Sequence, residues 1–124
     1  MADPKLAPFV GQKYISLETF KKSGQGVKTP VWFVLDRDVF YVYTDADSWK
    51  VKRIRNNPRV RVAVCNVRGS VKCPWVDATA SIVYGEEQRA AHRLLDRKYL
   101  LKLIGNVFAN VSRRTRATIR IDVA

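Results

Sequence analysis

The residues best suited to chemistry lie in one stretch near the middle of the chain. Thr44 ends a run of apolar and aromatic residues, and a helix is expected to begin at Ser48, with Asp47 or Ser48 as its N-cap. Lys50, Lys52 and Arg53 then fall in the first turns of that helix. Free backbone N–H groups and the helix dipole favour an anion at such an end, and hydroxyl and ammonium groups beside it would complete a phosphate cradle. The same residues also fit a solvent-exposed basic helix that Ser48 merely caps, so two interpretations stay open.

Other catalytic patterns do not occur in the sequence. It has no glycine-rich dinucleotide fingerprint and no Walker motif. The single histidine, His92, argues against a protein-held zinc site or a histidine-based triad, and we expect it to be solvated or partly packed. Cys65 and Cys73 are equidistant from Gly69, so in a symmetric hairpin they would face each other. We expect reduced, packed thiols there rather than a disulfide.

The charge of the chain points to anionic partners. The 124 residues include 23 Lys and Arg against 11 Asp and Glu, a net charge of +12. The densest block, residues 45–61, holds six basic and two acidic residues. Such a surface prefers phosphates, polycarboxylates, nucleic acids or acidic membranes. No apolar run approaches the roughly 20 residues of a membrane span, and no signal-peptide core is seen, so we expect a soluble, cytoplasmic protein.

The elements that must position these residues are mostly strands. Pro30 cannot donate to a strand ladder, so it should sit at an edge or a bulge. We expect one mainly β domain over residues 1–124, an antiparallel six-stranded barrel with helices at its ends, and a loose arm at residues 1–9. The residue patterns predict strands at Tyr14–Phe20, Val27–Leu35, Val39–Thr44, Val60–Asn66, Cys73–Gly85 and Ala117–Val123, and helices at Ser48–Asn57 and Glu86–Ile104, the second capped by Gly105.

The whole pattern resembles a known family. Four segments carry the resemblance: TPVWFV at 29–34, YVYT at 41–44, SWKVKRIRNNPRV at 48–60 and WVDATA at 75–80. Together they look like the split-barrel flavin-binding superfamily, the pyridoxamine-phosphate-oxidase-like group, over roughly residues 10–122. Within that group the sequence is most similar to the small oxidoreductases that use the deazaflavin coenzyme F420.

The resemblance implies a homodimeric split barrel with two cofactor sites at the subunit interface. The cofactor would be F420, with FMN as the alternative, and hydride would pass between its ring and a small organic acceptor. No general acid is then required, because the cofactor carries the hydride. Lys52 and Arg53 could assist phosphate binding or reach an acidic tail. The residues expected to bind the cofactor are Thr29, Pro30, Val31, Trp32, Thr44, Ser48, Lys50 and Arg53.

Two alternatives and some departures accompany this interpretation. A small basic barrel could instead bind nucleic acid, although the aromatic residues do not interleave with basic ones on one predicted strand face. A carrier that holds the cofactor without turnover also fits. Trp49 stands where many relatives have a small residue, and Asp45 and Asp47 place negative charge beside the proposed phosphate site.

Overall fold

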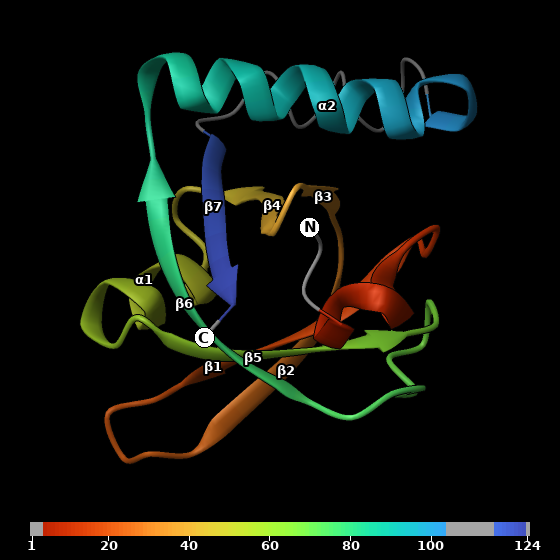
Figure 1. The fold of residues 1–124 in the computed structure, drawn as a ribbon. Coiled ribbons are helices and arrows are strands. Elements are labelled where there is room, and N and C mark those ends of the chain that lie inside the picture. Colours follow the sequence, from red (N-terminus) through yellow and green to blue (C-terminus); the bar gives the residue numbers. More distant parts are fainter. Residues whose placement is uncertain (1–3, 104–115, 124) are drawn as a thin grey trace.

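Seven antiparallel strands form one strongly curved sheet, a half-barrel, in the computed structural model (Figure 1). The structure describes residues 4–103 and 116–123. The strands follow the order β2-β1-β5-β6-β7-β4-β3, and each neighbouring pair is antiparallel. The elements are η1 (Pro4–Phe9), β1 (Tyr14–Phe20), β2 (Gly26–Trp32), β3 (Val34–Asp36), β4 (Val39–Asp45), α1 (Trp49–Asn56), β5 (Arg59–Cys65), β6 (Val76–Val83), α2 (Gly85–Leu103) and β7 (Arg116–Val123).

The strand predicted at Val27–Leu35 is in fact two strands, which corrects the expected number from six to seven. Phe33 lies at the break between β2 and β3. Its side chain is buried, and its ring lies 5.6 Å from that of Phe40, centre to centre. Because β2 and β3 occupy opposite edges of the sheet, the chain has to leave one ladder before it joins the other. The break makes this crossing and places Phe33 in the core.

The predicted hairpin between the cysteines also differs from the structure. Cys65 is paired with Val71, not with Cys73, because the connection to β6 is not symmetric about its glycine. The Cys73 sulfur instead accepts the backbone N–H of Val64 at 3.2 Å. The strand β6 begins at Val76, after the predicted start at Cys73. Both cysteines are free thiols.

Residues 4–9 do not form part of a loose arm, which we expected at 1–9. From Pro4 the described chain is a 3-10 helix, and its side chains Leu6 and Phe9 are 0% and 1% exposed. A 3-10 helix has three residues per turn, so these two apolar residues lie on one side of it. They join the core inside the half-barrel, where the ring of Phe9 lies 5.0 Å from that of Phe40.

The long helix α2 lies across one end of the half-barrel, over the face of β4 that points away from this core (Figure 1). Its Ala91 and Leu95 pack against Tyr41 and neighbouring apolar residues. His92 is partly buried, with Nε2 3.1 Å from the hydroxyl of Thr118, in line with the expectation of a partly packed histidine. The predicted cap at Gly105 lies outside the described residues.

Tyr41 anchors α2 and should ionise at unusually high pH. Its hydroxyl donates to the Glu87 carboxylate at 2.7 Å, and burial, with Glu87, raises the pKa of Tyr41 to about 12 from the ordinary 10.0. Between these values the unfolded chain binds fewer protons than the folded protein, so stability should fall as pH rises through this window. An ultraviolet absorbance titration should show a phenol ionising near pH 12 that vanishes in Tyr41→Phe and persists in Tyr84→Phe. Persistence in Tyr41→Phe would contradict the assignment.

Candidate functional site

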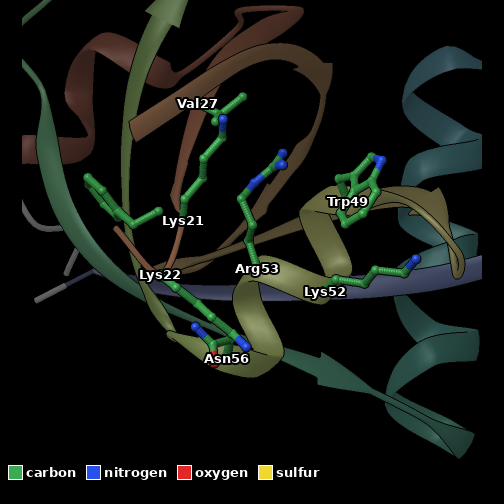
Figure 2. A pocket seen from close by; sticks show the side chains of 8 residues that line it. Lys21, Lys22, Val27, Trp49, Lys52, Arg53 and Asn56 are labelled. Atoms are coloured by element: carbon green, nitrogen blue, oxygen red, sulfur yellow. The ribbon is translucent and has the colours of Figure 1, made fainter. Parts of the chain in front are cut away.

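A groove of about 570 Å³ lies between α1 and the turn that joins β1 to β2 (Figure 2). We call it the α1 groove. Four of its eight lining residues are cations and none is acidic, so its charge suits an anionic ligand. The lining residues are Phe20, Lys21, Lys22, Val27, Trp49, Lys52, Arg53 and Asn56.

One face of α1 forms a wall of this groove. Val51 and Ile54 lie three positions apart and are buried, which holds the helix against the barrel. The other face is thereby turned toward the groove. Its residues, spaced at i, i+3, i+4 and i+7, are Trp49, Lys52, Arg53 and Asn56.

Arg53 is the predicted site residue that lines the groove. Its Nε donates to the hydroxyl of Thr19 on β1 at 2.6 Å. In Figure 2 its guanidinium points between Lys21 and Trp49. Burial lowers the pKa of Arg53, yet among the described residues no carboxylate lies within ion-pair distance of it. A partly buried cation without an anionic neighbour is suited to an anion from outside the chain.

Thr44 and Ser48 meet at the start of α1. The Thr44 hydroxyl donates to that of Ser48 at 3.2 Å, and the Ser48 oxygen accepts the Val51 N–H at 3.3 Å. Of the two expected N-cap residues, Asp47 and Ser48, the structure has Ser48 in that position. Since a serine hydroxyl has one donor and two acceptor positions, Ser48 keeps its own proton for a further acceptor.

Lys50 lies in the first turn of α1, beside the α1 groove rather than among its lining residues. Burial, followed by the nearby charge of Arg53, lowers the pKa of Lys50, while Asp45 acts in the opposite direction. A cation whose pKa is lowered by burial and by a second cation nearby is typical of a site that binds an anion.

The predicted residues 29–32 lie on β2, the strand that also supplies Val27 to the groove. In the described sheet β2 is an edge strand, with β1 as its one strand neighbour. The expected edge position of Pro30 is confirmed. The structure thus brings Arg53 into the groove, places three predicted residues at the adjacent helix start, and places the remaining four along the strand.

The sequence did not point to Thr19, Lys21 and Lys22, which contribute a contact to Arg53 and two charges to this region. Two adjacent lysines before a glycine-containing turn are a visible signal, but the central basic block dominates the charge of the chain. Thr19 gives no local signal, because its role depends on a contact with a helix far along the chain.

Other candidate sites have less support. A second groove, of about 470 Å³, lies beside η1 and Trp75 and is lined by a single cation and a single carboxylate. The described residues include no group of three or more histidine, cysteine, aspartate or glutamate side chains that could hold a metal ion. None of the helices within them is long and apolar enough to cross a membrane.

Comparison with known proteins agrees with the observed fold. Residues 2–124 match the family model for pyridoxamine 5'-phosphate oxidase. The heme storage protein HutZ from Vibrio cholerae has a TM-score of 0.74 at 17% identity, with 100% of this chain and 92% of that one covered. An F420 reductase has a TM-score of 0.68 at 16% identity, with 100% and 96% covered.

A FAD-binding protein from Mesorhizobium loti is similar as well, with a TM-score of 0.66 at 18% identity and 98% and 90% of the chains covered. No curated protein sequence matches the chain significantly. Identities this low show a shared fold, and the ligands of these three proteins differ in kind.

Proposed function

Because the chain belongs to the pyridoxamine 5'-phosphate oxidase family, we propose that it transfers hydride between the deazaflavin coenzyme F420 and a small organic acceptor. The observation that carries the proposal is the cationic lining of the α1 groove. Lys21, Lys22, Lys52 and Arg53 share it, and no acidic residue lines it.

The charges of the groove fit F420 better than FMN. F420 carries a phosphodiester and a polyglutamate tail, whereas FMN carries a single phosphate group. Four cations in one groove, with Lys50 beside it, exceed what a single phosphate neutralises. An elongated polyanion would contact all of them.

The predicted site residues take distinct roles in this proposal. Ser48, through its remaining O–H, and Lys50 would bind the phosphate, while Thr44 orients the Ser48 hydroxyl. Backbone groups of Thr29–Trp32, on the edge strand β2, would border the ring. When bound, F420 supplies the hydride-carrying ring carbon, so the chain itself has to bind, orient and shield the reactants.

A homodimer with the cofactor at the subunit interface remains part of the proposal. Trp49 is 70% exposed at the groove, and Lys52 lies over its ring at 4.5 Å. A second subunit that covered this indole would bury apolar area and close the groove from solvent.

Single-stranded nucleic acid is a second candidate ligand because of one observation. Trp49 and Phe20 line the same groove as the four cations, although the predicted strand faces showed no such interleaving. Aromatic rings beside cations are the arrangement on which unpaired bases stack.

A fluorescence titration at physiological salt with F420, FMN and oligothymidylate separates these functions. We expect F420 to bind with micromolar or tighter affinity and FMN to bind more weakly. A preference for FMN would leave the family intact and overturn the F420 assignment. Oligonucleotide binding that survives physiological salt would instead support the nucleic-acid function.

A further inference from the structure

The side chain of Arg53 is hydrogen-bonded to a residue of β1 that lies outside the predicted site. We propose that Thr19 is a positioning residue, whose hydroxyl fixes the Arg53 guanidinium so that its free edge binds the anionic part of the ligand. The choice of F420 as that ligand rests on the proposed function, but the positioning role does not.

Thr19 is buried in the strand ladder of β1 and β2. It is 0% exposed and lies within β1, where it pairs with Val27 of β2. Val27 itself lines the groove. The bond from Arg53 Nε to the Thr19 hydroxyl, at 2.6 Å, therefore connects α1 to the strand residue that pairs with Val27.

The chemistry of this bond leaves Arg53 free to bind. A guanidinium has five N–H donors, and the Thr19 contact uses the one on Nε. The four N–H groups of the two terminal nitrogens remain for a bidentate contact with phosphate or carboxylate. Because the side chain is already ordered, ligand binding does not have to restrict its rotamers.

Two other partly buried arginines differ from Arg53 in the charge of their partners. Arg61 contacts the carboxylate of Glu18 at 3.1 Å, and Arg120 contacts those of Glu87 and Asp122. Those charges are neutralised within the protein. Arg53 is bonded instead to a neutral hydroxyl, which orients the cation without cancelling its charge. This difference is expected of an arginine that serves a ligand rather than the fold.

The test compares Thr19→Val, which keeps the shape and removes the acceptor, with Thr19→Ser, which keeps the hydroxyl. Affinities for F420 and for pyrophosphate are measured at fixed ionic strength, and the Arg53 Nε–Hε resonance is followed by NMR in the same samples. We expect Thr19→Val to bind both ligands about five- to tenfold more weakly, with faster exchange of the Nε proton, and Thr19→Ser to stay within about twofold of the wild type.

The outcomes separate the two proposals. Wild-type affinity in Thr19→Val overturns the positioning role even if F420 binds tightly. Loss of pyrophosphate affinity in Thr19→Val, restored in Thr19→Ser, supports it even if F420 does not bind, and the cofactor assignment then falls alone. If Thr19→Val does not fold, the wild-type spectrum decides, because an Arg53 Nε proton that exchanges as fast as in free arginine overturns the proposal.

Discussion

Replacing Arg53 by glutamine is expected to weaken F420 binding by about 10- to 100-fold at physiological salt, since a hydrogen bond to a charged group contributes about 1.5–3 kcal/mol. The guanidinium is partly buried in the α1 groove, where salt screens its charge less than at an open surface. Glutamine keeps a polar side chain there but loses the charge and the bidentate fork. The measurement is the dissociation constant from a fluorescence titration.

Arg55→Gln is the matched control for this prediction. Arg55 belongs to the same helix, and its replacement by glutamine removes the same charge. Its side chain is exposed, donates to the Tyr84 hydroxyl at 3.2 Å and does not line the groove. Its effect on affinity should stay within about threefold, as for a screened surface charge. Equal losses in the two variants would mean that the ligand responds to net charge alone, and the assignment of Arg53 to the site would be wrong.

Phe9→Ala should lower the free energy of unfolding by about 3–5 kcal/mol, the range for a buried phenylalanine truncated in a core. Phe9 is 1% exposed, and its ring meets those of Phe40 and Phe33 edge-on, at centroid distances of 5.0 and 6.5 Å. Removing it leaves a cavity inside the half-barrel. Chemical denaturation followed by circular dichroism measures the change.

The neighbouring residue supplies the control. Val10 is 68% exposed, so Val10→Ala should change stability by no more than about 0.5 kcal/mol. The affinity of the folded Phe9→Ala protein for F420 should remain that of the wild type, because Phe9 does not line the α1 groove. Similar stability in the two variants would show that η1 does not belong to the core.

Local patterns predicted most of the elements of this fold. β1 has the predicted bounds, and α1 begins after the predicted cap Ser48. These features depend on alternation, capping and turn residues, which act over a few positions. The resemblance to the pyridoxamine-phosphate-oxidase-like group is confirmed by the family match over residues 2–124. The break at Phe33 was not predicted, because an unbroken apolar run does not reveal that its halves pair with opposite edges of a sheet.

The sequence by itself determined the strand-rich class, the excess of positive charge, the capped basic helix and the family. The tertiary structure decided which charges share a groove. Lys21 and Lys22 lie in the turn between β1 and β2, whereas Arg53 lies on α1, and the contact between Thr19 and Arg53 spans 34 positions of the chain. Residues this far apart are brought together by the packing of α1 against the barrel, through Val51 and Ile54, and no local pattern encodes that proximity.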